Sequence, residues 1–167
     1  MTHDDAMRSA LREARAAAEA GETPTGAVIV YRDPTAPDAP ARVIARARNQ
    51  VELLKDPTAH AEMIAITQAA SALGGWRLLN TTLYVTKEPC PMCAGAIVLA
   101  RIPAVVFGVP DPARGAAGSK FNLLEHPDLN HRCTVVSGVL ADECRHLLQT
   151  FFQACRARKP KPQPNQT

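Results

Sequence analysis

Aromatic side chains are scarce in this sequence of 167 residues, which contains four Phe, two Tyr and one Trp. A core formed by such a chain must consist mainly of Ala, Val, Leu and Ile side chains. Long apolar runs are lacking as well, because the longest extends only from Cys93 to Ala100 and ends at Arg101. A run of this length cannot cross a membrane. The length of the chain fits one domain with a substantial core.

Cysteine is also infrequent, with five copies in the chain. Five is an odd number, and the cysteines are too sparse for a scaffold held together by disulfides. We therefore expect reduced cysteines that fill the core or bind metal. The first residues, Met1 to Asp5, are polar and acidic where an export signal would be basic and then apolar. These features predict a cytoplasmic protein.

Neither sign of charge is in large excess. The formal net charge is +3. This value is compatible with a nucleic-acid partner and equally with a slightly basic enzyme that binds no polyanion. Charge alone therefore leaves the partner open.

The spacing of apolar residues predicts helices that alternate with strands. Helices are expected over residues 5–20, 59–73, 91–99 and 141–157, and strands over residues 27–31, 43–47, 83–85, 104–109 and 134–139. This order predicts a layered α/β domain with helices on both faces of the sheet. The last two strands are far enough apart in sequence for a crossover that would make them parallel, with room for a short helix near residues 121–124.

Two segments are predicted to lie outside this core. The loop 33–41 contains three prolines and reads as an exposed hairpin tip. The end of the chain, residues 159–167, is rich in Lys and Pro and reads as a disordered basic tail. The folded domain is therefore expected to span residues 1–158.

Two short motifs carry the chemistry. His60-Ala61-Glu62 stands at the start of one predicted helix, and Pro89-Cys90-Pro91-Met92-Cys93 stands at a strand-to-helix turn. Two thiolates three residues apart at a helix start can bind one ion, and the helix N-terminus favours the thiolate form. His60 would complete a set of three ligands that leaves the fourth position of zinc to water, as in catalytic sites. Glu62 is placed to exchange protons between that water, whose pKa zinc lowers to roughly 7, and a substrate nitrogen.

A Cys-x-x-Cys pair on its own fits other sites too, such as a redox pair or half of a closed structural zinc site. A proline on each side of Cys90, without a thioredoxin-like context, argues against redox chemistry. A closed site would need a fourth ligand, and none of the other candidates forms a second pair with ligand spacing. These candidates are Cys133, Cys144, Cys155, His126, His131 and His146. We therefore favour catalytic zinc and expect Cys133, Cys144 and Cys155 to be buried or incidental.

The order His-x-Glu and then Pro-Cys-x-x-Cys is the signature of nucleobase deaminases. The chain resembles, in particular, the bacterial tRNA-specific adenosine deaminases of the cytidine/deoxycytidylate deaminase superfamily. The matching segments are Pro24–Val28, Asp56–Glu62, Leu83–Thr86, Glu88–Ala96, Arg101–Ile102, Val105–Gly108, Gly115–Ser119, His126–Pro127, Asn130–Arg132, Leu140–Cys144 and Phe151–Phe152. The zinc motif is shared with cytosine, guanine and pterin-type deaminases. The segment Gly115–Ser119, together with Asn130–Arg132 and the C-terminal helix, is more specific to the tRNA enzymes.

This resemblance implies a three-layer α/β/α fold with a mixed five-stranded sheet, and a homodimer with one zinc ion per subunit. It assigns His60, Cys90 and Cys93 as zinc ligands and Glu62 as the proton shuttle. The implied reaction is the hydrolytic deamination of adenosine to inosine at the wobble position of a tRNA anticodon. The rival interpretations are a deaminase of free purine bases such as guanine, and a zinc-stabilised RNA-binding module without catalysis.

The same resemblance points to residues that would contact the RNA. Asn49 matches an asparagine that contacts the flipped purine, and an amide can donate to and accept from a base edge. Asp111, Asn130 and Phe152 fall where the family meets the anticodon loop. Phe152 would stack on an unpaired base or else pack against the core. The basic residues Arg156, Arg158, Lys159 and Lys161 would follow the phosphates or remain solvated.

The sequence also departs from the family pattern at three places. The loop 33–41 is longer, Pro110 and Pro112 flank Asp111, and Thr150 precedes the two phenylalanines. These departures leave the chemistry unchanged and bear on which tRNA bases are read.

Overall fold

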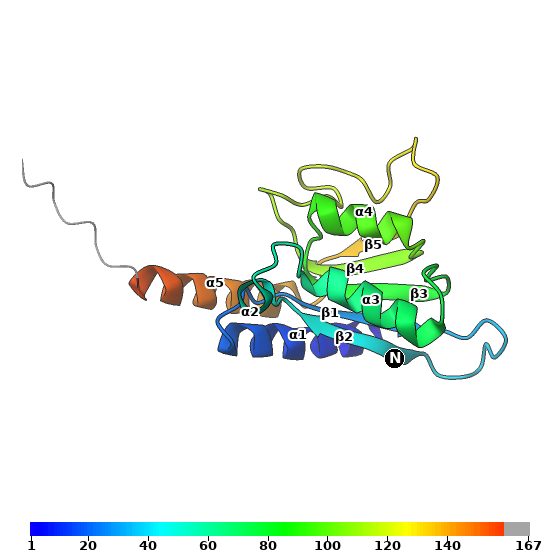
Figure 1. Ribbon diagram of the computed structural model, residues 1–167, viewed down its shortest axis with the longest axis horizontal. Helices are drawn as coiled ribbons and strands as arrows, with labels where there is room; N and C mark the ends of the chain where they lie inside the picture. Colours follow the sequence, from blue (N-terminus) through cyan, green and yellow to red (C-terminus); the bar gives the residue numbers. More distant parts are fainter. Residues whose placement is uncertain (159–167) are drawn as a thin grey trace, which may run out of the picture.

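A five-stranded sheet with helices on both faces organises residues 1–158, which are the residues that the computed structural model describes (Figure 1). In chain order the elements are α1 (His3–Glu19), β1 (Gly26–Tyr31), β2 (Arg42–Arg48), α2 (Val51–Leu54), α3 (Ala61–Leu73), β3 (Thr81–Lys87), α4 (Pro91–Leu99), β4 (Ala104–Val109), β5 (Thr134–Ser137) and α5 (Ala141–Arg158). The predicted tail, residues 159–167, lies outside the described residues.

The strand order in the sheet is β2-β1-β3-β4-β5. Strand β1 pairs antiparallel with β2 and with β3, whereas β3 pairs parallel with β4 and β4 parallel with β5. Helix α4 is the crossover between β3 and β4, as parallel neighbours require. The predicted mixed sheet and the parallel last pair are therefore confirmed.

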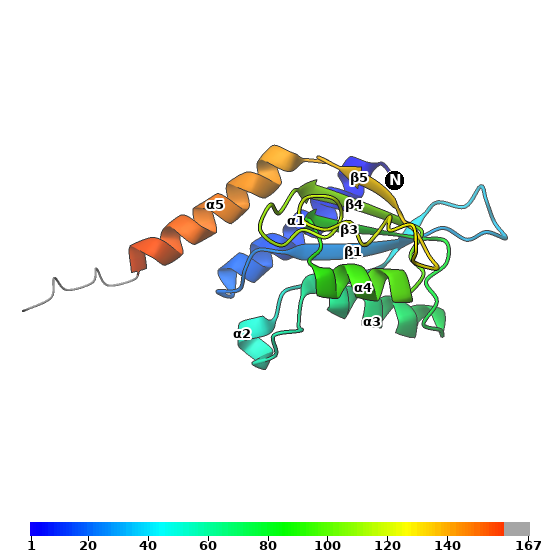
Figure 2. The ribbon, with the colours of Figure 1, turned by 90° about the horizontal axis from the view of Figure 1, so that it is seen from above.

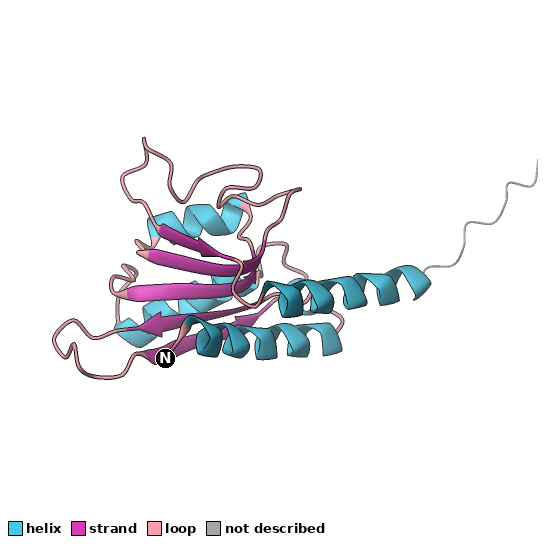
Figure 3. Cartoon of the chain, turned by 180° about the vertical axis from the view of Figure 1, so that it is seen from behind, coloured by secondary structure: helices cyan, strands magenta, loops and turns pink. Residues whose placement is uncertain are grey.

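The helices form two separate layers. Helices α3 and α4 cover one face of the sheet, and α1 and α5 cover the other (Figures 2 and 3). Side chains alternate along each strand, so that Leu83 and Val85 pack under α3 and α4 while Tyr84 packs under α1. Both cores consist largely of Ala, Val, Leu and Ile, as the shortage of aromatic residues requires.

Helix α1 lies unusually close to the sheet at Gly26. A Cβ atom at this position would overlap with the backbone carbonyl of Ala10 and would contact the backbone nitrogen of Ala14 at 2.5 Å. The amide of Gly26 also donates to the Thr86 hydroxyl at 3.2 Å. Glycine is therefore required here by close packing and not by an unusual backbone angle.

One local prediction needs correction, and one short helix was missed. The short helix expected near residues 121–124 is wrong, since this segment forms turns and one isolated bridge between Ala117 and Asn122. The amides of Lys120 and Phe121 both donate to the carbonyl of Gly115, so they are not available for the hydrogen bonds of a local helix. Helix α2 was not predicted, because four residues without a buried side chain leave no periodic signal.

The remaining elements follow the predicted order with small shifts at their ends. The loop 33–41 forms the largely exposed tip of the β1–β2 hairpin, as predicted. Every helix within residues 1–158 is too short or too polar to span a bilayer.

Candidate active site

The three predicted metal ligands come from two helix starts at the same edge of the sheet. His60 is the N-cap residue of α3, Cys90 is the N-cap residue of α4, and Cys93 lies in the first turn of α4. Pro91 suits the first position of α4, where its fixed φ fits a helix and a missing amide costs nothing. The local sequence thus directs all three side chains to one place.

The donor atoms lie at separations that fit a metal ion. His60 Nδ1 is 3.7 Å from Cys90 Sγ and 3.5 Å from Cys93 Sγ, and the three ligand atoms all lie within 4.8 Å of one another. Zinc bond lengths in a tetrahedral site put nitrogen and sulfur ligands about 3.6 Å apart. These residues can therefore hold a metal ion, and within residues 1–158 no fourth His, Cys, Asp or Glu belongs to the group.

The ionisation of the two thiols differs. Hydrogen bonds from Cys93 and from His60 lower the pKa of Cys90 to about 3, although burial opposes this shift. The pKa of Cys93 is raised, because its hydrogen bond to Cys90 and its burial both favour the thiol. The lowered pKa of Cys90 favours its thiolate, which is the form that binds metal.

Glu62 points into the same site from the first turn of α3. Its side chain is almost fully buried, with 3% of the residue exposed, and burial raises its pKa. Its Oε2 atom is the one buried side-chain oxygen or nitrogen of the described residues that has no hydrogen-bond partner. An unpaired buried carboxylate oxygen is costly, so this atom marks a place where a ligand or water supplies the missing partner.

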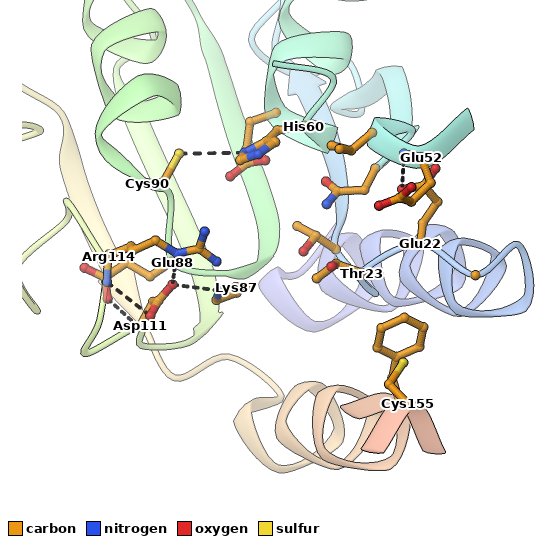
Figure 4. A pocket seen from close by; sticks show the side chains of 16 residues that line it. Glu22, Thr23, Glu52, His60, Lys87, Glu88, Cys90, Asp111, Arg114 and Cys155 are labelled. Carbon is orange, nitrogen blue, oxygen red and sulfur yellow. Dashed lines mark hydrogen bonds and ion pairs between the residues drawn. The ribbon is translucent and has the colours of Figure 1, made fainter. Parts of the chain in front are cut away.

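A cavity of about 410 Å³ opens beside these groups. Its volume is in the range of sites for small ligands. His60, Glu62 and Cys90 form part of its wall. The rest comes from the end of β3, from the loops that follow α1, β2, β3 and β4, and from α2 and α5 (Figure 4). These loops meet because the ends of β2, β3 and β4 lie at the same edge of the sheet as the start of β1.

Two of the four predicted RNA contacts line this cavity. The Oδ1 atom of the buried Asn49 accepts from the amide of Ala61 at 2.9 Å, which leaves its NH2 group as a donor for a ligand. Asp111 also lies on the wall, where its Oδ2 atom is 2.6 Å from Lys87 Nζ.

The other two lie elsewhere. Asn130 is exposed and accepts from Arg101 Nη1 at 2.6 Å. Phe152 is 42% exposed and is not part of the cavity wall, whereas its neighbour Phe151 is. The two rings are in edge contact, with centroids 5.4 Å apart. Their roles toward RNA stay predictions.

The sequence reasoning missed several residues of the cavity wall. They are Glu22, Lys87, Glu88, Arg114, Phe151 and Cys155. Cys155 is half-buried at the cavity, whereas Cys133 and Cys144 are buried in the cores, as predicted. The one available signal was Glu88, an acidic residue next to the Pro-Cys motif at the end of a buried strand.

Glu88 organises the loop after β4. Its buried carboxylate accepts from the amides of Asp111 at 2.8 Å, Ala117 at 2.9 Å and Ser119 at 3.0 Å, and from the Ser119 hydroxyl. Burial opposes ionisation, but these hydrogen bonds outweigh it and lower the pKa of Glu88. The segment Gly115–Ser119 is therefore wrapped around one carboxylate, which fixes the adjacent wall of the cavity.

Glu22 has a similar role at the opposite wall. Its buried carboxylate accepts from the amides of Glu52 at 3.2 Å and Leu53 at 2.8 Å, at the start of α2. Because α2 has no buried side chain, these two hydrogen bonds are a main attachment of the helix.

We expect Glu22→Ala to loosen α2 and to lower the free energy of unfolding by about 1–3 kcal/mol, because two amides lose a charged acceptor. Hydrogen exchange would show faster exchange at Glu52 and Leu53. Glu19→Ala, which removes an exposed carboxylate from the end of α1, is the matched control and leaves both rates unchanged. Unaltered protection of α2 in Glu22→Ala would show that other contacts hold this helix.

Comparison with known proteins agrees with this arrangement. The model of the MafB19-like deaminase family matches residues 1–156. The chain therefore belongs to a deaminase family.

Individual relatives narrow the family further. The tRNA-specific adenosine deaminase of Bacillus subtilis is 48% identical, over 99% of this chain and 98% of the relative. A solved structure from a study of A-to-I editing by tRNA:A34 deaminases at the wobble position of transfer RNA has a TM-score of 0.78 and 43% identity, covering 86% of this chain and 99% of that one. The guanine deaminase of Bacillus subtilis is more distant, with a TM-score of 0.60 and 33% identity over 98% of this chain and 99% of that one. The chain belongs to the tRNA-specific adenosine deaminases, which confirms the resemblance and the predicted fold.

Proposed function

We propose that this enzyme converts adenosine to inosine at the wobble position of a tRNA anticodon by hydrolytic deamination. The relatives that share nearly half of its residues bear the name of that activity. The observation that carries the proposal is the unpartnered Oε2 atom of Glu62, buried beside His60 and two cysteines at the wall of a cavity of ligand size.

His60, Cys90 and Cys93 would hold one zinc ion through Nδ1 and the two Sγ atoms. Two sulfurs and one imidazole suit zinc, and three ligands are typical of a catalytic zinc site. When bound, zinc lowers the pKa of a coordinated water to roughly 7 and so supplies hydroxide at neutral pH.

The residues around that position perform the proton transfers and hold the base. Glu62 accepts the proton that water loses as its oxygen bonds to the carbon bearing the exocyclic amine, and passes it to the adjacent ring nitrogen. Glu62 then delivers a second proton from the former water to the amine, the C–N bond breaks, and ammonia leaves. The free NH2 group of Asn49 donates to the purine edge and orients the ring.

The substrate reaches the cavity as an unpaired base of the anticodon loop, which costs little to unstack. Asp111, Asn130 and Phe152 would contact neighbouring nucleotides, and the basic end of α5 would follow the phosphates. The family resemblance adds a homodimer and a cytoplasmic location to the proposal.

The direct test is to incubate the zinc-loaded enzyme with an anticodon stem-loop and, separately, with free guanine. Inosine in the stem-loop together with released ammonia is expected, and guanine should remain unchanged. Ammonia from guanine without inosine in the RNA would favour the free-base deaminase instead. Bound metal and bound RNA without either product would favour the non-catalytic module.

A further inference from the structure

Two basic side chains, Lys87 and Arg114, lie on the cavity wall, and they differ in how closely they contact a carboxylate. Lys87 Nζ is 2.6 Å from Asp111 Oδ2, and both side chains are largely buried. Arg114 Nε lies 4.0 Å from the same oxygen, and its side chain is 70% exposed. One carboxylate thus faces two cations, and Lys87 has the shorter contact.

The Asp111 carboxylate remains charged in this arrangement. Burial opposes its ionisation, but the Lys87 ammonium and the amides of Ala113 and Arg114 lower the pKa of Asp111. The short contact with Lys87 is therefore a true ion pair. Arg114 therefore has only the longer contact with Asp111, and its exposed guanidinium group remains available to a ligand at the cavity wall.

The backbone that presents Arg114 is rigid. Pro110 and Pro112 flank Asp111, whose Oδ1 atom accepts from the amides of Ala113 at 3.1 Å and Arg114 at 3.3 Å. The carbonyl of Asp111 accepts from Gly115 at 2.7 Å, which closes the turn. An exposed side chain on a fixed turn loses less backbone freedom when it binds a ligand.

The rest of the wall does not attract an anion. Glu22 and Glu88 use their carboxylates to accept backbone amides, and Glu52 carries an exposed negative charge toward Lys55 at 3.7 Å. Arg114 lies on one side of the cavity, and α2, which carries Glu52, lies on the other (Figure 4). A guanidinium group fits a phosphate through two parallel hydrogen bonds.

We propose that Arg114 binds a phosphate group that flanks the base inserted into the cavity. The Lys87–Asp111 ion pair and the rigid turn hold Arg114 in place for this contact. This inference rests on the proposed function, because it needs a polynucleotide substrate. A free base has no such phosphate, so this contact acts only on a substrate that carries a phosphate beside the base.

The test uses Arg114→Gln, Arg114→Lys and the wild-type enzyme on three anticodon stem-loops. One loop is unmodified, and each of the others has a neutral methylphosphonate in place of one phosphate beside the target adenosine. For Arg114→Gln on the unmodified loop, KM is expected to rise roughly 10-fold, with kcat within about 2-fold. The slope of log KM against log salt should fall by about 0.7, as for one lost phosphate contact in a single strand.

The methylphosphonate loops identify the contact. One of them should raise the KM of the wild-type enzyme roughly 10-fold and leave that of Arg114→Gln unchanged. Arg114→Lys should recover most of the salt dependence, because it keeps the charge. Arg42→Gln, at the far end of β2 from Asn49, is the matched control with unchanged KM.

Three results would overturn the inference: no change of KM in Arg114→Gln, no effect of either methylphosphonate on the wild-type enzyme, or equal effects on both enzymes. Melting temperatures of the variants should match the wild-type value, because Arg114 is exposed. A wild-type enzyme that forms no inosine in the unmodified loop would instead contradict the proposed function itself.

Discussion

Glu62→Gln is expected to retain the metal ion and to lose turnover by a factor of about 10²–10⁴, the range of general acid–base catalysis. Glutamine has nearly the same shape, so the buried position of Glu62 in α3 remains filled. Its amide cannot exchange protons between water and the base. The measurement is inosine formation in a stem-loop under single-turnover conditions, with metal content determined on the same sample.

Cys90→Ala is the informative partner of this variant. It removes one of the three donor atoms and is expected to lose both metal and turnover, because metal binding depends on the deprotonated ligand set. Together the two variants distinguish the metal-binding role of Cys90 from the proton-transfer role of Glu62. Wild-type-like activity in Glu62→Gln, or full metal content in Cys90→Ala, would remove these roles.

The centre of this site could be predicted because its residues are close in sequence. Cys90 and Cys93 lie three residues apart in one helical turn, which directs both thiols to one place. His60 and Glu62 lie two residues apart at the start of α3, and both line the cavity. The meeting of the two helix starts follows from the alternation of strands and helices, since α3 and α4 cover the same face of the sheet. Sequence pattern therefore predicted both the fold class and the metal group.

The rest of the cavity wall depends on how distant segments pack. Phe151 and Phe152 are neighbours on α5, about 100° apart around the helix axis, and only the crossing of α5 over the sheet decides which one faces the cavity. Glu22 and Glu88 act through backbone amides of other loops, and an amide has no signature in the sequence. These carboxylates could be assigned only once the loops were placed.

The largest effect on the structure of the cavity wall is expected for Gly115→Ala. A Cβ atom at this position would overlap with the carboxylate of Glu88, which is buried and held by four hydrogen bonds. The carboxylate must then leave its donors, which we expect to lower the free energy of unfolding by about 2–4 kcal/mol. The melting temperature should fall by roughly 5–15 °C. KM for the stem-loop should rise as well, because Asp111 and Arg114 belong to the same loop.

A double-mutant cycle with Glu88→Ala separates this overlap from other effects of the extra methyl group. Glu88→Ala is itself destabilising, because it leaves buried amides without an acceptor. In that background, however, the space is vacant, so Gly115→Ala should add little further loss. Gly95→Ala is the matched control, since a Cβ atom there meets no atom within 4 Å and alanine favours the helix. If Gly115→Ala lowers the free energy of unfolding equally in both backgrounds, then the glycine is needed for the turn itself and not to leave space for the Glu88 carboxylate.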